Sequence, residues 1–129
     1  IIRNPVNDIL FVKNFGDTLW TLPGGLVEPV ESPAFAIVRE ISEELNVTLK
    51  IESLLGVFSG AHFRVVYPNK DRVVFVTSVF ELTVDANELT PDGIEIEEAV
   101  FMGTNDIEKL TVPAWVKEIL VNREKGVQY

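Results

Sequence analysis

The spacing of apolar residues predicts an amphipathic helix from Pro33 to about Leu45. At about 100° per residue, its apolar side chains fall on one stripe that must face a core. Ser32 suits the N-cap, and proline is tolerated at the first helical position because its missing donor is not needed there. The stripe consists of Ala34, Val38, Ile41 and Leu45, with Ile37 at its edge.

Short apolar or alternating runs predict strands on both sides of this helix. A turn at residues 67–71, with the sequence YPNKD, joins the strands predicted at residues 61–67 and 72–82 as a hairpin. The end of an earlier strand lies at residues 1–2, and the other predicted strands span residues 9–12, 18–22, 49–58, 61–67 and 72–82.

The segment from Thr111 onward predicts a second amphipathic helix, with Pro113 near its start and Trp115 on its apolar side. Strands and helices therefore interleave through short loops. This order predicts an α/β fold, a mixed β-sheet between helices in an α/β/α sandwich, as one domain over residues 1–129.

The first helix carries Glu40, Glu43 and Glu44 in one arc beside the apolar stripe, and Ala36 leaves room in the same arc. Like charges on one helix face repel, so something positive is expected among them. Mg²⁺ is commonly held by a few carboxylates together with substrate phosphates. Glutamates on a helix are most often only a solvated face, however, and the segment before the helix decides between these interpretations.

That segment contains Leu22-Pro23-Gly24-Gly25, and the whole stretch resembles the signature of the Nudix (MutT-like) hydrolases, G-x5-E-x7-R-E-U-x-E-E-x-G-U, where U is a bulky aliphatic residue. One specified position departs: Asn46 stands where the family has glycine. Asparagine is the next most tolerant residue in the left-handed conformation that ends a helix, so the change is structurally mild. The matching residues are Gly25, Glu31, Arg39, Glu40, Ile41, Glu43, Glu44 and Val47.

The resemblance implies a Nudix-type sandwich that hydrolyses the diphosphate linkage of a nucleoside diphosphate joined to another group. It implies Mg²⁺, with Mn²⁺ as a substitute, bound by Glu40, Glu43, Glu44 and the Gly24 carbonyl. It also implies that Glu31 and Arg39 pair and, with Gly25, support the site.

A glutamate outside the signature often completes the metal cluster or acts as the general base in this family. Glu95, Glu97 and Glu98 are the candidates, and their position favours Glu98 and Glu95. The expected catalytic set is therefore Glu43, Glu44 and Glu98, and a carboxylate that is not fully used as a ligand takes the proton.

Substrate contacts are expected from the predicted hairpin and from the segment that carries the outer glutamates. Cationic side chains suit phosphate oxygens, although each taken singly is more often solvated. His62, the one histidine, is more often structural than catalytic in such a position. The candidate substrate-binding residues are Arg64, Tyr67, Arg72 and Glu95, with Lys70 as a further cation.

Composition narrows the class of protein. The chain has 129 residues, no cysteine and a net charge of −9. The acidic balance argues against broad nucleic-acid binding, while bound metal still allows a small phosphorylated nucleotide-type substrate. No apolar run approaches the roughly 18 residues of a membrane span, and a cysteine-free chain fits a cytoplasmic setting. Because the chain starts at Ile1 rather than methionine, its true N-terminus is expected to be missing or processed.

Several alternatives remain open at this point. The main one is a non-catalytic Nudix-fold module that binds a nucleotide or a protein partner, although such a module is expected to lack one of the glutamates. An isoprenoid diphosphate isomerase calls for a cysteine that this chain lacks, and an RNA end-processing enzyme fits the acidic charge poorly. The family includes dimers, so the apolar strands at 61–82 are a candidate homodimer interface. The signature identifies the bond that is cut and leaves the substrate open.

Overall fold

The computed structural model describes residues 1–85, 88–127 and 129. Its main sheet has the strand order β3-β6-β1-β2-β7. The pairing is mixed, because β1 runs parallel to β6 and the other neighbours are antiparallel. The strands of this sheet are β1 (Ile2–Arg3), β2 (Ile9–Asn14), β3 (Ile51–Phe58), β6 (Thr77–Thr83) and β7 (Ile96–Met102).

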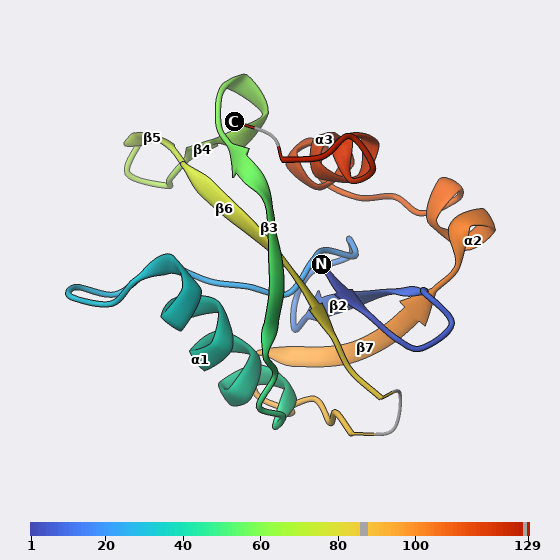
Figure 1. Cartoon of the computed structure of the whole chain (residues 1–129). Coiled ribbons are helices and arrows are strands. Elements are labelled where there is room, and N and C mark those ends of the chain that lie inside the picture. The colour runs from blue at the N-terminus through green and yellow to red at the C-terminus, as the bar shows by residue number, and fades with distance from the viewer. Residues whose placement is uncertain (86–87, 128) are drawn as a thin grey trace.

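Helices cover both faces of the sheet (Figure 1). Along β2, Leu10 and Val12 belong to the core cluster that includes α1, while Ile9 and Phe11 belong to the cluster that includes α3. This alternation is the period of two expected for a strand buried on both faces. The structure therefore confirms the predicted α/β/α sandwich. The helices are α1 (Pro33–Leu45), the short α2 (Thr104–Glu108) and α3 (Ala114–Asn122).

The ends of α1 follow from its sequence. The Ser32 side chain accepts a hydrogen bond from the Phe35 amide at 3.1 Å, and Pro33 begins the helix. Asn46 ends it in the left-handed conformation, with φ 55° and ψ 35°. The predicted boundaries of this helix are confirmed.

The buried face of α1 differs from the predicted stripe. Ile41 and Leu45 are buried as expected, but Ala34 and Val38 are only partly covered, and the buried positions include Ala36 and Glu44 instead. The helix is therefore rotated so that Glu40 and Glu44 face the protein, while Glu43 stays exposed. The loop of residues 22–31, which contains Gly24 and Gly25 and is called the glycine loop below, lies against the Glu40 carboxylate.

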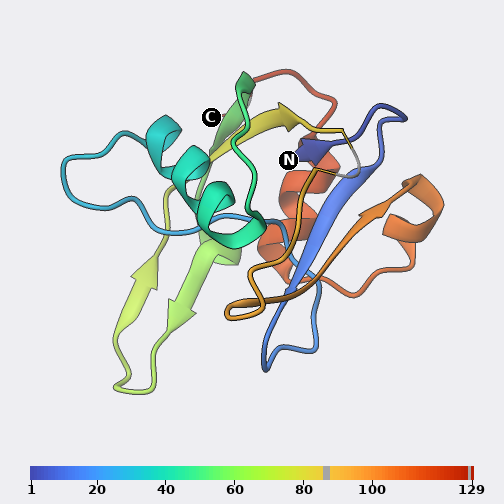
Figure 2. The same ribbon diagram turned by 90° about the horizontal axis from the view of Figure 1, so that it is seen from below.

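Three predicted strands are shorter or interrupted. Residues 61–67 begin as a 3₁₀ turn, η1 (Ala61–Phe63), before β4 (Arg64–Val66), and residues 72–82 divide into β5 (Arg72–Val74) and β6. Phe63 is buried and accepts a backbone hydrogen bond from Phe75 at 3.0 Å, so the chain bends inward there. The β4–β5 hairpin consequently leaves the main sheet and projects from the molecule (Figure 2). Residues 18–22 make only the isolated bridge between Val12 and Thr21.

The buried face of α1 predicts how the fold responds to truncation. Ile41 is fully buried, so Ile41→Ala is expected to lower the free energy of unfolding by about 2–5 kcal/mol through lost burial and a residual cavity. The matched control is Phe35→Ala on the same helix, because Phe35 is 62% exposed and its removal should cost much less. Urea unfolding measures both values, and equal losses would contradict this orientation of α1.

Candidate active site

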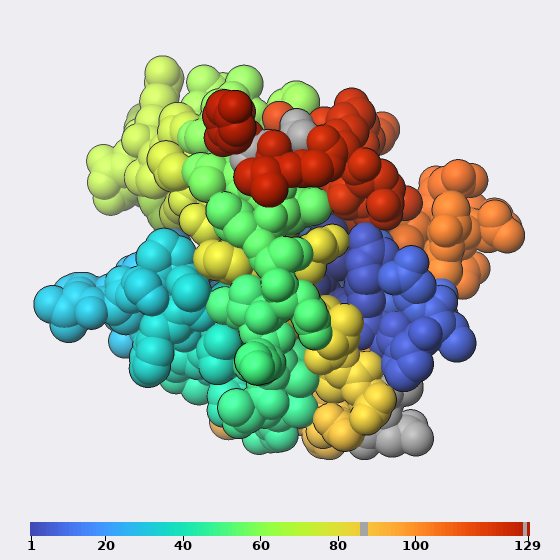
Figure 3. Space-filling model, viewed as in Figure 1, coloured from blue at the N-terminus to red at the C-terminus, as the bar shows by residue number. Residues whose placement is uncertain are grey.

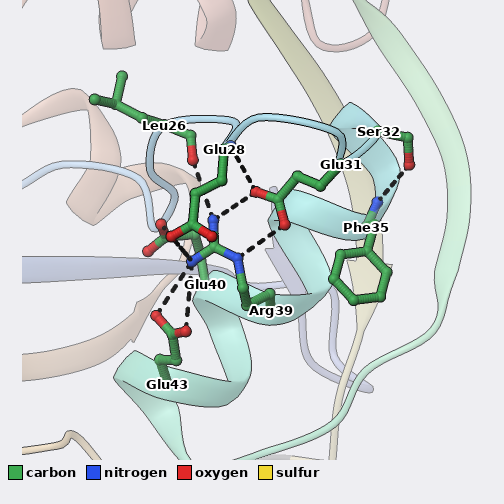
Figure 4. Close-up of polar contacts among 8 residues, drawn as sticks. All are labelled: Leu26, Glu28, Glu31, Ser32, Phe35, Arg39, Glu40 and Glu43. Carbon is green, nitrogen blue, oxygen red and sulfur yellow. Dashed lines mark hydrogen bonds and ion pairs between the residues drawn. The ribbon is translucent and has the colours of Figure 1, made fainter.

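Arg39 joins the glycine loop to α1 (Figure 4). Its guanidinium holds both oxygens of Glu31, with Nη2 at 2.7 Å and Nε at 3.0 Å, and Nη2 also donates to the Leu26 carbonyl at 3.1 Å. Glu31 accepts a further hydrogen bond from the Glu28 amide at 2.8 Å. Hydrogen bonding from Arg39 lowers the pKa of Glu31, so this carboxylate stays ionised in its fork.

The same guanidinium also provides positive charge among the glutamates of α1. Nη1 of Arg39 lies 3.1 Å from Glu40 and 3.3 Å from Glu43, and 3.7 Å from Glu28 on the loop. Arg39 thus contacts Glu31 of the loop through Nε and Nη2, and Glu40 and Glu43 of the helix through Nη1. Glu44 lies outside this arrangement.

Glu44 is buried, with 6% of its surface exposed. Burial, followed by the nearby charge of Glu40, raises its pKa from 4.5 to about 8. Glu95 and Asp92 add smaller effects in the same direction. No lysine or arginine among the described residues forms an ion pair with Glu44. A buried carboxylate without a cation is costly, so Glu44 and Glu40 form a pair that would bind a cation favourably.

Gly25 is required by its contact with Glu40. A Cβ atom on Gly25 would overlap the Glu40 carboxylate, so only glycine lets the loop backbone lie against this group. At the neighbouring Gly24, an added Cβ would lie 3.8 Å from Ile37, an ordinary contact distance. The loop and the helix carboxylates are therefore in direct contact.

Glu95 and Glu98, the two favoured glutamates outside the signature, lie in different parts of the structure. Glu95 is exposed on the loop before β7 and lies close enough to Glu44 and Asp92 to act on the Glu44 charge. Glu98 pairs in register with Lys13, whereas the neighbouring pair, Val12 and Ala99, packs in the core beside α1. Alternation along the strand therefore places Glu98 on the opposite face of the sheet, and the structure does not bring it to the α1 glutamates.

An apolar cleft of about 560 Å³ opens beside the glycine loop. In the space-filling view, one wall is the loop and the start of α1, in cyan, and the other wall includes β6 and the base of the hairpin, in green and yellow (Figure 3). Thr21, Asn14 and Ser78 add polar groups to its lining. The apolar lining includes Leu22, Ile37, Phe63, Phe75, Val79 and Trp115.

Only part of the predicted substrate set lines this cleft. Arg64 lines it, but Tyr67 and Arg72 lie farther out on the β4–β5 hairpin and are not part of the lining. His62 lines it too, and its Nδ1 lies 3.0 Å from Glu118 of α3. Glu95 does not line the cleft but lies near Glu44 together with Glu40 and Asp92, and these four residues are called the carboxylate cluster below.

Sequence reasoning missed Glu28 and Asp92. Glu28 contacts Arg39 from the loop, and Asp92 accepts hydrogen bonds from three backbone amides close to Glu44. The Asp92-Gly93 pair was a usable signal, because aspartate before glycine commonly organises a tight turn through its own side chain.

The carboxylate cluster fits a hard divalent cation in its donor chemistry. As the side chains stand, no three acidic or histidine side chains in the described part of the chain surround a common point that could hold a metal ion. Glu43 instead points toward Arg39, as Figure 4 shows. Among the described residues, buried Glu44 forms no ion pair with a lysine or arginine and lies beside the carboxylate of Glu40, and this observation favours a metal here.

Comparison with known proteins adds an independent observation. The model of the NUDIX domain family matches residues 1–122. The chain belongs to the Nudix family. The match includes the glycine loop, the whole of α1 and the outer glutamates. The family that the signature indicated is thereby confirmed, and the match extends beyond the signature to almost the full chain.

Similar Nudix proteins have different names. An ADP-ribose pyrophosphatase of Methanocaldococcus jannaschii is 38% identical over 108 residues, which cover 81% of this chain and 59% of that protein. A mouse diphosphoinositol polyphosphate phosphohydrolase 3-alpha is 39% identical over 90 residues, or 63% of this chain and 50% of that protein. This chain thus spans only half to three fifths of the lengths of these relatives.

Among solved structures, a MutT protein of Methanosarcina mazei superposes with a TM-score of 0.77 at 22% identity, covering 97% of this chain and 88% of that one. At this identity the likeness establishes the fold. Separately, none of the helices in the described ranges is long and apolar enough to cross a membrane.

The state of Glu44 predicts a pH dependence of stability in metal-free protein. The folded state holds the Glu44 proton more tightly than the unfolded chain, because the pKa is raised from 4.5 to about 8. Its contribution is therefore fully present below about pH 4.5 and lost as the pH rises through about 8. Denaturant unfolding in chelator should show wild type losing stability over this range relative to Glu44→Gln, which cannot ionise. Parallel curves for the two proteins would refute the assignment.

Proposed function

We propose that this chain is a divalent-metal-dependent hydrolase that cleaves the diphosphate linkage of a nucleoside diphosphate joined to another group. The observation that carries this proposal is the buried carboxyl group of Glu44 beside Glu40, whose carboxylate in turn lies against a glycine loop that lines an apolar cleft. The names of the Nudix relatives, which specify pyrophosphatase and phosphohydrolase activities, support the same reaction class.

Each residue has a distinct task in this proposal. Glu40 and Glu44 would hold Mg²⁺, with Mn²⁺ as a substitute, and Glu43 and the Gly24 carbonyl would complete the ligands. Bound Mg²⁺ supplies positive charge against the phosphates and makes water more acidic. Gly25 keeps the loop backbone against Glu40, while Arg39 and Glu31 hold the loop and the helix in register.

We assign the proton-accepting role to Glu95 in preference to Glu98. Glu95 lies on the same side as Glu44 and is exposed, so it can reach a water molecule beside the carboxylate cluster. Glu98 lies on the other face of the sheet, beside Lys13.

The cleft supports a nucleoside as the group attached to the phosphates. Its apolar and aromatic lining suits a flat nucleobase, and Thr21, Asn14 and Ser78 offer hydrogen bonds to base edges. Arg64 lies in the lining, where it would contact a phosphate. An inositol pyrophosphate carries dense negative charge, which a chain with a net charge of −9 and such a cleft would accommodate poorly.

A substrate panel tests the proposal. ADP-ribose, an oxidised deoxynucleoside triphosphate, a dinucleoside polyphosphate, a nucleotide sugar and an inositol pyrophosphate are incubated with Mg²⁺, and the products are separated by anion exchange. We expect hydrolysis of at least one nucleotide, loss of activity in chelator and recovery with Mg²⁺ or Mn²⁺. Turnover of the inositol compound alone would exclude the nucleoside assignment.

Glu44→Gln is expected to lower kcat by roughly 10²-fold or more, because it removes a carboxylate charge from the reacting centre. Circular dichroism should show an intact fold, since glutamine resembles the protonated side chain. The matched control is Glu108→Gln on α2, an exposed position away from the cluster, which should leave kcat unchanged. Near wild-type turnover in Glu44→Gln would remove Glu44 from the mechanism.

Gly25→Ala is expected to reduce kcat about tenfold with little loss of stability, because the new methyl group displaces the flexible end of Glu40 rather than backbone. Gly103→Ala is the control, since a Cβ there would also approach a carboxylate oxygen, that of Asp8 at 3.3 Å, away from the site. Steady-state kinetics and thermal unfolding distinguish the two. Unchanged kcat in Gly25→Ala would show that the position of Glu40 does not matter.

A further inference from the structure

Asn46 ends α1 and also makes a side-chain hydrogen bond to a distant loop. Its backbone is in the left-handed region, and its N–H donates to the Ser42 carbonyl at 3.1 Å. Glycine satisfies both requirements with less steric cost, so the helix end by itself does not explain an asparagine here. The side chain supplies a second interaction that glycine cannot make.

The Asn46 side-chain amide donates to the Thr90 carbonyl at 2.8 Å, across a separation of 44 residues. Two backbone bonds reinforce this contact: the Thr90 amide donates to Leu45 at 2.9 Å, and the Asp92 amide donates to Glu44 at 2.8 Å. The loop before β7 is therefore attached to the last turn of α1, on the residue next to Glu44 and on Glu44 itself.

The attached loop carries Glu95 as part of a compact turn. One oxygen of Asp92 accepts hydrogen bonds from the amides of Ile94, Glu95 and Ile96, at 3.0, 3.1 and 3.0 Å. On the other side, the Glu95 carbonyl accepts from the Phe15 amide at 3.0 Å. A turn fixed at so many points moves as a unit, so its attachment at Thr90 affects where Glu95 lies.

We propose that Asn46 is a positioning residue, which holds the loop from Thr90 to Ile96, and with it Glu95, against Glu44 through the hydrogen bond from its side-chain amide to the Thr90 carbonyl. This inference rests on the proposed function in one respect, the role of Glu95 as proton acceptor. The attachment of the loop stands independently of that role.

Asn46→Gly separates positioning from folding. The variant loses the amide donor, but glycine adopts the left-handed conformation more readily, so the two effects on global stability largely offset each other. Asn46→Asp also loses the donor while keeping the size of the side chain and its tolerance of this conformation. A property that both variants lose therefore reports the amide donor.

Asn7→Gly is the matched control. Asn7 is also an asparagine in the left-handed region, with φ 68°, but it lies in the turn between β1 and β2. Its side chain accepts from Arg3 of β1 at 3.3 Å, and Asn7 is not part of the lining of the cleft. Any general consequence of replacing a left-handed asparagine by glycine appears in this variant as well.

Two measurements test the proposal in the full chain. Amide hydrogen exchange should be about fivefold faster at Thr90 and Asp92 in both Asn46 variants, as expected for one lost hydrogen bond, with the centre of α1 unchanged. With Mg²⁺ and a nucleotide substrate from the panel, kcat should fall about tenfold at constant KM. Asn7→Gly should leave both properties at wild-type values.

The outcomes are distinguishable. Wild-type exchange at Thr90 and Asp92 in the Asn46 variants would overturn the attachment, and faster exchange with wild-type kcat would overturn the positioning role. A rise in KM at constant kcat would overturn it too, because it would indicate a substrate contact instead. If wild type hydrolyses no substrate of the panel, the proposed function fails, and exchange still decides whether Asn46 holds the loop.

Discussion

The bidentate bond between Arg39 and Glu31 is the interaction on which the organisation of the site depends. Both side chains are largely buried, with 17% and 9% of their surfaces exposed, so a change that removed Arg39 would leave the Glu31 charge without its cation. The pair fixes the loop to the helix, and Gly25 then brings the loop backbone against Glu40. A loop that would otherwise be a flexible surface segment becomes one wall of a shaped cleft.

The electrostatic character of the site follows from how unevenly Arg39 distributes its charge. It forms ion pairs with Glu31, Glu40 and Glu43, yet Glu44 stays buried beside Glu40 without a cation of its own among the described residues. The environment thus disfavours the ionised form of Glu44, and a bound cation would stabilise that form. Groups with such shifted pKa values cluster at functional sites.

The sandwich supplies the parts that meet at this point. The sheet supports α1 on one face, and the bend at Phe63 and Phe75 directs the β4–β5 hairpin away so that the cleft stays open. The loop before β7, more than 40 residues after α1 in the sequence, is hydrogen-bonded to the C-terminal end of α1 and places Glu95 and Asp92 near Glu44. The site therefore combines segments from distant parts of the sequence.

The sequence by itself determined α1, from its Ser32 cap to its left-handed end at Asn46, because helix signals are local and depend on neighbouring residues. The order of predicted elements indicated the sandwich, and the resemblance to the Nudix signature implied the pair of Glu31 and Arg39, which the structure contains. Three features were visible only in the tertiary structure: the burial of Ala36 and Glu44, the division of the 72–82 segment, and the position of Glu95 rather than Glu98 beside Glu44.

The side of the sheet to which a strand residue points depends on strand register and bulges. The burial of a carboxylate depends on which segments pack over it. Both are set by contacts between segments that are distant in the chain.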